Sequence, residues 1–225
     1  MDNKTALVFG ATGLTGSKLV ELLVDDGRYS EIIVFVRRKY GFENQKIKVK
    51  LVDFSIPQSF QEDIVGHDVF CCLGSTMKQS NNSHTAFRSV DIDLTIKIAE
   101  MASLNKVSSF IVVSSIGAST TSRNFYLRTK GKMEARLKKI PFQNLVIVRP
   151  SILLGPRNDK RSFERAGQTM AKLFKFAFVG KLKKYRGINA KDLASAMIHI
   201  ANQNEGTAIV ENDKLLQIAH SIRIH

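Results

Sequence analysis

Three features of the sequence predict an α/β fold built on a doubly wound parallel sheet. Short apolar runs, rich in β-branched residues, alternate with segments whose apolar residues recur at helical spacing. The runs are apolar throughout rather than on every second residue, which is typical of parallel strands covered by helices on both faces. There is no internal repeat and no low-complexity linker, so the 225 residues are expected to form one domain.

The expected elements follow one another as βα units require. Strands are expected at Thr5–Gly10, Glu31–Val36, Ile47–Val52, Asp68–Leu73, Ser109–Ser114 and Leu145–Arg149. Helices are expected at Leu14–Asp26, Pro57–Val65, Phe87–Leu104 and Phe125–Lys139. The sequence changes character from Ser151 on, where the expected elements are a helix at Ala190–Asn202, a strand at Thr207–Val210 and a helix at Asp213–His220. Residues 151–225 are interpreted as a small substrate-side cap or lid region of the single domain 1–225.

The turn after the first strand carries a glycine at every third position and reads Gly10-Ala11-Thr12-Gly13-Leu14-Thr15-Gly16. Glycines there permit a tight turn and a close backbone approach to a pyrophosphate, and the next helix presents free N–H groups and its positive dipole end. Thr12 and Thr15 add hydroxyl groups. Strand, turn and helix in immediate succession favour a dinucleotide-binding site. A tight turn without a ligand is the alternative.

The second strand ends in the basic sequence Arg37-Arg38-Lys39. A site that prefers NAD usually places Asp or Glu here, to hold the 2′-hydroxyl of the adenosine ribose. Arginine instead accommodates a 2′-phosphate, and no carboxylate occupies this strand end. Arg37 and Arg38 therefore favour NADP(H) over NAD(H), with a solvated basic loop as the alternative.

The ends of the third and fourth strands supply further candidates for cofactor binding. Asp53 can accept a hydrogen bond from the adenine amino group and Phe54 can flank the ring, although Asp53 can equally be an ordinary turn-starting residue. After the fourth strand, a glycine lets the backbone pass close to a ligand, and hydroxyl groups can meet phosphate or ribose. The residues at this position are Leu73, Gly74, Ser75 and Thr76.

A Tyr-x-x-x-Lys sequence, Tyr126 to Lys130, follows the fifth strand. Residues four apart share one helix face, so the Lys130 ammonium can lie beside the Tyr126 phenol and favour the phenolate. Tyr126 then becomes a usable proton donor or acceptor near neutral pH. Ser115, just after the strand, can hold a substrate carbonyl. Because this spacing arises easily by chance, the argument depends on its place after the fifth strand, opposite the glycine turn.

In combination these motifs resemble those of the short-chain dehydrogenase/reductases, in particular their atypical branch. The resemblance covers about residues 5–200. It is carried by Gly10–Gly16, Cys71–Thr76, Ser114–Ala118, Tyr126–Gly131 and Val148–Ser151. It implies a Rossmann fold that binds NADP(H), with Ser115, Tyr126 and Lys130 as the catalytic residues.

The same resemblance bears on two further segments. It implies that Arg149, Pro150, Ser151 and Ile152 pass near the nicotinamide. Extended members often carry Asn where this chain has Asp91, a departure that weakens any proton relay taken from the family. The chain after Ser151 is short for a full sugar-nucleotide domain, and some atypical members keep the fold without demonstrated turnover.

The formal net charge of +14 is open to several interpretations: nucleic acid, an anionic membrane surface, an anionic ligand or a lysine-rich solvated surface. No zinc-finger or RNA-recognition signature accompanies it, so nucleic-acid binding is not expected. Basic and apolar residues interleave in Asn158–Arg186. This segment suits a lid or a packing helix, and also a membrane surface or a partner.

Cysteine, histidine and hydropathy patterns exclude other classes. The only cysteines, Cys71 and Cys72, lie in an apolar run and are interpreted as core residues rather than as a redox pair. The five histidines show no metal-ligand spacing, so no metal is expected. Without a secretory signal or an apolar run of ~18 residues, the chain is expected to be cytoplasmic, without stable membrane insertion.

Two functions from different classes remain open. One is an NADP(H)-dependent oxidoreductase that transfers a hydride to or from a small carbonyl-type substrate. The other is a non-catalytic NADP(H)-binding regulatory protein that recognises a protein partner. Helices Phe87–Leu104 and Phe125–Lys139 can also pair in a homodimer.

Overall fold

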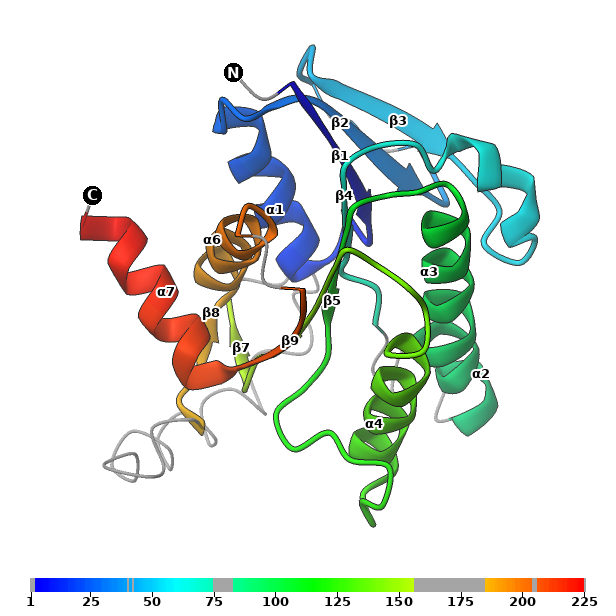
Figure 1. Cartoon of the computed structure of the whole chain (residues 1–225), viewed down its shortest axis with the longest axis vertical. Coiled ribbons are helices and arrows are strands. Elements are labelled where there is room, and N and C mark those ends of the chain that lie inside the picture. The colour runs from blue at the N-terminus through cyan, green and yellow to red at the C-terminus, as the bar shows by residue number, and fades with distance from the viewer. Residues whose placement is uncertain are drawn as a thin grey trace.

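Seven parallel strands form the central sheet of the computed structural model, which describes residues 3–39, 41, 43–74, 83–155, 185–203 and 206–224. Their order in the sheet is β3-β2-β1-β4-β5-β6-β9 (Figure 1). The order reverses between β1 and β4, and in such sheets the ligand crevice lies at the carboxyl ends of the strands beside that point. Every expected strand is confirmed, with ends shifted by at most two residues. The strands are β1 (Lys4–Phe9), β2 (Tyr29–Val36), β3 (Ile47–Leu51), β4 (Asp68–Cys71), β5 (Ser109–Val113), β6 (Asn144–Arg149) and β9 (Thr207–Glu211).

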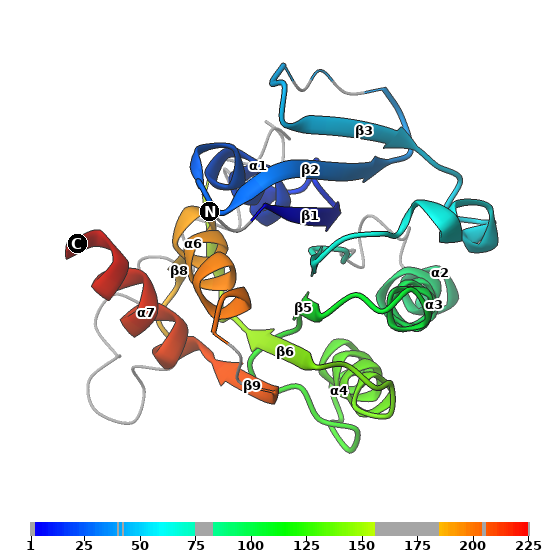
Figure 2. The same cartoon turned by 45° about the horizontal axis from the view of Figure 1, so that its top comes forward.

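Helices cover both faces of the sheet (Figure 2). One layer consists of α1 (Leu14–Asp25), α6 (Ala190–Ala201) and α7 (Asn212–Ile224). The other layer consists of α2 (His84–Arg88), α3 (Thr95–Leu104) and α4 (Phe125–Leu137). Successive strand residues point to opposite faces, so Val8 belongs to the core under α1 while Phe9 belongs to the core under α3. This two-sided burial explains the continuous apolar runs and confirms the doubly wound architecture.

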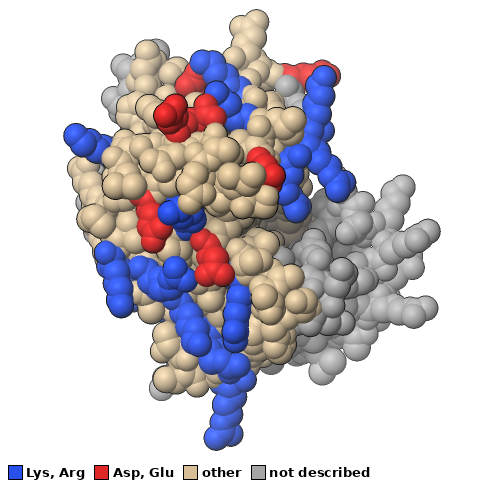
Figure 3. Space-filling model, turned by 90° about the vertical axis from the view of Figure 1, so that its right-hand side faces the viewer, with Lys and Arg blue, Asp and Glu red and all other residues tan. Residues whose placement is uncertain are grey.

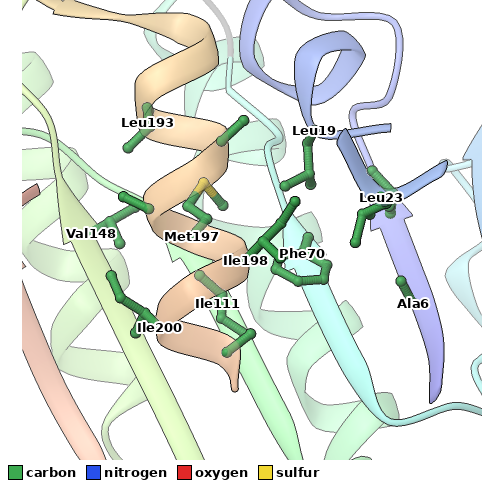
Figure 4. Packing of buried hydrophobic residues seen from close by; sticks show 14 of the residues in the cluster. Ala6, Leu19, Leu23, Phe70, Ile111, Val148, Leu193, Met197, Ile198 and Ile200 are labelled. Atoms are coloured by element: carbon green, nitrogen blue, oxygen red, sulfur yellow. The ribbon is translucent and has the colours of Figure 1, made fainter. Parts of the chain in front are cut away.

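The core on the α1 side is closed by side chains from segments far apart in the chain (Figure 4). Leu19 and Leu23 of α1 and Met197 and Ile200 of α6 are fully buried there, with Phe70 of β4. Each such burial stabilises the fold by about 1.5–3 kcal/mol relative to an exposed side chain. The N-terminal and C-terminal thirds of the chain therefore share one core.

The C-terminal third contributes more to this core than the sequence predicted. β9 extends the sheet beside β6, and the apolar face of α6 packs on α1. The cap role of residues 151–225 stays a prediction. Two short strands, β7 (Leu153–Leu154) and β8 (Ile188–Asn189), form a separate parallel ribbon. The basic segment expected to form a lid lies outside the described residues except for Tyr185 and Arg186.

The expected helix Phe87–Leu104 is interrupted. A π-helical turn, η2 (Ser89–Leu94), lies between α2 and α3 and shifts the register of the inward-facing side chains. Two consecutive residues, Asp91 and Ile92, are buried there. Such turns occur frequently at functional sites. The segment expected as a helix from Pro57 is a kinked 3₁₀ helix, η1 (Pro57–Asp63).

Candidate active site

The glycine turn between β1 and α1 is packed too closely for a side chain at two of its three glycines. Gly10 has φ +82°, and a Cβ there would lie 2.7 Å from the carbonyl oxygen of Cys72. A Cβ on Gly16 would overlap the carbonyl oxygen of Gly10. A Cβ on Gly13 would lie 3.2 Å from the same oxygen and meet no other described atom within 4 Å. Gly13 therefore faces open space, while Gly10 and Gly16 make the turn possible.

The first turn of α1 leaves its backbone N–H groups available. Gly13 is the N-cap residue, no side chain caps it, and the first turn holds no acidic residue. The arrangement suits an anion, because the N–H groups and the positive end of the dipole point to one place. Thr12 borders the space in front of this turn, whereas Thr15 is buried and Leu14 packs beside Gly155.

A cleft of 640 Å³ opens at the carboxyl ends of β1, β2 and β4. The opposite wall comes from α2 and η2, which follow each other directly in the chain. Four lining residues in this wall were not expected, because the sequence does not show which helix face turns to the cleft: Ala86, Ser89, Val90 and Leu94. The other lining residues are Gly10, Thr12, Gly13, Phe35, Val36, Arg37, Phe54, Cys72, Leu73 and Gly74.

The basic end of β2 lies at this cleft. Arg37 lines it, and Arg38 is the next exposed residue. Neither arginine forms an ion pair with a carboxylate in the described part of the chain. Their guanidinium groups are therefore available to an anionic ligand at the cleft mouth.

The end of β3 places its two candidate residues differently. Phe54 lines the cleft and packs edge-on against Phe60, with ring centroids 5.6 Å apart. Asp53 is exposed, and its Oδ1 accepts hydrogen bonds from the backbone N–H and the hydroxyl of Ser55, at 2.8 and 2.7 Å. These bonds hold the pKa of Asp53 below its ordinary value. The structure thus gives Asp53 a turn-forming role, the alternative that the sequence left open.

Tyr126 and Lys130 share one face of α4, as their spacing predicted. Lys130 Nζ lies 2.7 Å from Asp91 Oδ1 and donates to the carbonyl oxygen of Val113 at 3.3 Å. Burial alone would lower the pKa of Lys130, but the Asp91 carboxylate and the Tyr126 phenol together raise it above its ordinary value. Tyr126 is half-buried, with its ring edge-on to Phe87. A charged ammonium therefore lies beside this phenol.

The loop that carries Ser115 is pressed against α4. A Cβ on Gly131 would overlap the backbone of Ser119, and the Ser119 N–H donates to the carbonyl oxygen of Leu127 at 3.1 Å. Ser115 is half-buried at the start of this loop. Among the described residues, its hydroxyl makes only a long contact, 3.4 Å, to the neighbouring Ile116 oxygen. The close packing fixes the loop against the helix. The Ser115 hydroxyl forms only a weak hydrogen bond with the described residues.

A family of proteins described as NAD(P)H-binding matches residues 10–204, which include the glycine turn, the cleft and α4. The chain belongs to this family. Protein HTATIP2 of Rattus norvegicus is a relative, 34% identical over 168 residues, which cover 73% of this chain and 69% of that protein. Protein FMP52, mitochondrial, of Candida albicans is 28% identical over 97% of this chain and 99% of its own length. The family predicted from the motifs is thus confirmed.

Solved structures with low sequence identity share the fold. A UDP-N-acetylglucosamine 4-epimerase from Methanobrevibacter ruminantium is 18% identical, with a TM-score of 0.70 over 94% of this chain and 77% of that one. A putative NAD-dependent epimerase/dehydratase from Bacillus halodurans is 19% identical, with a TM-score of 0.68 over 97% of this chain and 100% of that one. At these identities the likeness establishes the Rossmann architecture of this family member and no activity.

In this NAD(P)H-binding protein, Arg149 has a structural role. Its Nε and Nη2 donate to both oxygens of the buried Glu134 carboxylate, at 3.0 and 2.6 Å, and its Nη1 donates to Glu211 at 2.8 Å. Glu134 also accepts a 2.5 Å hydrogen bond from the Ser114 hydroxyl. The hydrogen bonds that Arg149 donates to the Glu134 carboxylate raise the pKa of Arg149 above its ordinary value. This network joins β6, α4, β9 and the start of the Ser115 loop, so the Arg149 guanidinium takes part in structural hydrogen bonds. Its expected position near the nicotinamide stays a prediction.

The three residues after Arg149 continue along the same end of the sheet. The carbonyl oxygen of Pro150 accepts a hydrogen bond from the Ile116 N–H at 3.0 Å. Ser151 donates its hydroxyl to the carbonyl oxygen of Tyr185 at 2.9 Å. Ile152 is 44% exposed. The backbone at Pro150 therefore lies beside the Ser115 loop. That Pro150, Ser151 and Ile152 pass near the nicotinamide stays a prediction.

The remaining candidates have mixed outcomes. Ser75 and Thr76 lie outside the described residues, whereas Gly74 borders the cleft. Both cysteines are free thiols: Cys71 is buried in the core, and Cys72 is half-buried at the cleft wall. Burial raises the pKa of Cys71 to about 11.

Within the described ranges, no cluster of three or more His, Cys, Asp or Glu side chains could hold a metal, and no helix is long and apolar enough to cross a membrane.

Proposed function

We propose that this protein is an NADP(H)-dependent reductase of the short-chain dehydrogenase/reductase type, acting on a small carbonyl-type substrate. One observation carries the proposal. Lys130 Nζ would lie 3.7 Å from a Cβ on Gly74, and Gly74 lines the cleft that begins at the glycine turn. The Lys130 ammonium thus lies behind the part of the cleft wall that Gly74 forms, within reach of a dinucleotide that extends along the cleft from the glycine turn.

The residues around the cleft fit NADP(H). The N-terminus of α1, opened by Gly13, suits the pyrophosphate. Arg37 and Arg38 suit the 2′-phosphate, because both are exposed and form no ion pair with another described residue. Phe54 supplies an apolar wall for adenine. The half-exposed Leu73 continues the wall toward Lys130.

Each residue of the proposed catalytic group has a separate role. NADPH, when bound, supplies a hydride to the carbonyl carbon. Tyr126 gives its hydroxyl proton to the carbonyl oxygen, so the C=O double bond becomes a C–O single bond and an O–H bond forms. The Lys130 ammonium stabilises the phenolate left on Tyr126, which regains a proton from solvent. Ser115 donates a hydrogen bond to the same carbonyl oxygen and orients it.

Oxidation of NADPH in the presence of a panel of aldehydes, ketones and quinones tests this function. We expect at least one compound to be reduced, with a matching amount of alcohol or hydroquinone formed. Ser115→Ala should then raise KM or lower kcat without changing the affinity for NADPH, because Ser115 contacts only the carbonyl. Tight NADPH binding with no turnover across the panel would contradict the proposal.

A second candidate is an NADP(H)-bound regulator that recognises a protein partner, and a specific surface favours it. The outer face of α4 and its C-terminal extension carry exposed basic residues: Lys132, Arg136, Lys138 and Lys139. Figure 3 faces the α2–α3–α4 layer and shows basic side chains gathered in its lower half. Asp93 is the acidic neighbour that pairs with Arg136, at 3.2 Å. This basic face opposes a homodimer through α4, because like charges would meet across a two-fold axis, and it suits an acidic protein surface.

Charge reversal separates this second candidate from the first. Lys132→Glu combined with Lys139→Glu should weaken capture of an acidic partner at least about tenfold, because both changes lie in the proposed contact. NADPH affinity should stay the same. Lys191→Glu with Lys214→Glu, on the opposite layer, is the matched control. A partner that binds both pairs of variants equally would exclude the α4 face.

The proposed location is the cytoplasm. The yeast relatives carry the word mitochondrial in their names, so fractionation of cells that express a tagged protein is the discriminating measurement. Recovery with mitochondria would contradict the cytoplasmic proposal without affecting the proposed reaction.

A further inference from the structure

A buried carboxylate, Asp91, contacts the lysine that the proposed function places beside the proton donor. Asp91 lies in η2, and its side chain is fully buried. Its Oδ1 lies 2.7 Å from Lys130 Nζ, and the Lys130 side chain is only 4% exposed. Because water is nearly absent, each charge acts on the other far more strongly than a surface pair would.

Three segments of the chain surround this pair. Lys130 Nζ also donates to the carbonyl oxygen of Val113 at the end of β5. A Cβ on Gly74, just after β4, would lie 3.7 Å from both Asp91 Oδ1 and Lys130 Nζ. On the third side, the π-turn places Asp91 and the next residue, Ile92, inward together. The pair therefore lies directly behind the cleft wall, at the carboxyl ends of β4 and β5.

The other titratable groups that act on the pair are few in the described part of the chain. Cys71 at the end of β4 is a neutral thiol, since burial raises its pKa to about 11. Tyr126 on α4 interacts with the Lys130 charge. β5 contributes a backbone carbonyl, and α3 contributes the Thr95 hydroxyl, which contacts Cys71. Asp91 is thus the carboxylate that opposes Lys130.

We propose that Asp91 is a positioning residue that anchors the Lys130 ammonium and offsets part of its charge, so that Tyr126 keeps its proton until a substrate oxygen takes it. The proposal rests on the proposed reductase function. An unopposed ammonium beside Tyr126 would stabilise the phenolate, and the nearby carboxylate offsets this effect. The arrangement favours proton donation, in which the Tyr126 O–H bond breaks as an O–H bond forms on the substrate, while NADPH supplies the hydride.

Ultraviolet difference titration of the cofactor-free protein tests the effect on Tyr126. Tyrosinate absorbance is recorded against pH for the native protein and for Asp91→Asn, which keeps the side-chain size. The same titration is recorded for a matching protein that also carries Tyr126→Phe, and its curve is subtracted. The difference is the absorbance of Tyr126, one of the four tyrosines. Circular dichroism confirms that the variants keep the fold.

We expect the Tyr126 phenolate to form about one pH unit lower in Asp91→Asn, a tenfold change in proton affinity, because Lys130 loses its counter-ion. An unchanged or higher midpoint would overturn the proposal. No substrate is needed, so this result is independent of whether the protein reduces carbonyls.

A double-mutant cycle tests the anchoring itself and covers the case in which Asp91→Asn does not fold. Lys130→Met removes the ammonium that opposes the buried Asp91 carboxylate, whereas Lys130→Met with Asp91→Asn removes both charges. We expect the double variant to unfold at a higher urea concentration than Lys130→Met alone. Lys132→Met, at an exposed position two residues away, is the matched control. A double variant no more stable than Lys130→Met would show that the side chains are not coupled, and would contradict anchoring.

Discussion

The same three residue types, a buried Asp, a Lys and a Tyr, occur at both ends of the parallel strands, which are called here the amino-terminal and the carboxyl edge of the sheet. Their arrangements suit different purposes. At the amino-terminal edge, the hydroxyl of the fully buried Tyr29 donates to Asp68 at 2.7 Å. Lys4 Nζ lies 3.4 Å from the same carboxylate. The Asn202 side chain contacts both Lys4 and Tyr29. This cluster ties the starts of β1, β2 and β4 to the end of α6, and its role is structural.

At the carboxyl edge the carboxylate pairs with the lysine instead of the tyrosine. Asp91 contacts Lys130, and Tyr126 is half-buried. The Tyr126 hydroxyl makes no hydrogen bond to any of the described residues, so it is available to a ligand. The difference teaches that residue type alone does not mark a reactive tyrosine. A reactive tyrosine is distinguished by its hydrogen-bond partner, by its exposure and by the edge of the sheet where it lies.

Removal of the lysine should affect the two clusters very differently. Lys130→Met removes the ammonium that opposes the buried Asp91 carboxylate, so we expect the free energy of unfolding to fall by about 3–5 kcal/mol. Lys4→Met should lower it by about 1 kcal/mol or less, because the Lys4 side chain is 23% exposed and Asp68 keeps the Tyr29 hydroxyl. Urea denaturation measures both changes. Equal losses would remove the distinction between the two edges.

Removal of each tyrosine hydroxyl should separate catalysis from stability. Tyr126→Phe keeps the ring against Phe87 and should reduce turnover of an accepted carbonyl by about 10²-fold, with little change in NADPH affinity. Tyr29→Phe should leave turnover unchanged but lower the free energy of unfolding by about 1–3 kcal/mol, because Asp68 loses a buried donor. Steady-state kinetics and urea denaturation of both variants provide the test. Native turnover in Tyr126→Phe would refute the catalytic role.

The amino-terminal cluster should also have a signature at alkaline pH. Burial, together with the Asp68 carboxylate, raises the pKa of Tyr29 above its ordinary value of 10.0. The folded protein then holds this proton more tightly than the unfolded chain does. The resulting stability is fully present below pH ~10 and is lost as the pH rises further, by up to about 1.4 kcal/mol per pH unit.

Comparison with Tyr29→Phe isolates this effect from other groups that titrate in the same range. We expect the free energy of unfolding of the native protein to fall more steeply above pH ~10 than that of the variant. Urea denaturation at a series of pH values measures the two slopes. Parallel slopes would show that Tyr29 holds its proton no more tightly in the folded state than in the unfolded chain.

The sequence was sufficient for features that depend on local pattern. The strands are buried on both faces, so each one is visible as an apolar run, and the glycine turn is specified by neighbouring residues. Tyr126 and Lys130 were predicted for the same reason, because four residues span one helical turn.

Features created by tertiary packing were not visible in the sequence. The contact between Asp91 and Lys130 depends on a π-turn and on the juxtaposition of α4 with the ends of β4 and β5. Arg149 was assigned to the cofactor by resemblance, yet its guanidinium binds Glu134. Likewise, the sequence of Ala190–Ala201 shows an apolar helix face but not that this face packs on α1.

Isothermal titration calorimetry with NADPH and NADH tests most directly the central claim, that the carboxyl edge of the sheet is an NADP(H) site. We predict that the native protein binds NADPH at least about tenfold more tightly than NADH, a difference of ~1.4 kcal/mol, because Arg37 and Arg38 can contact the 2′-phosphate. Arg37→Ala with Arg38→Ala should abolish this preference and leave NADH affinity nearly unchanged, while Lys191→Ala, on α6, should alter neither. Equal affinities of the native protein for the two cofactors would contradict the account.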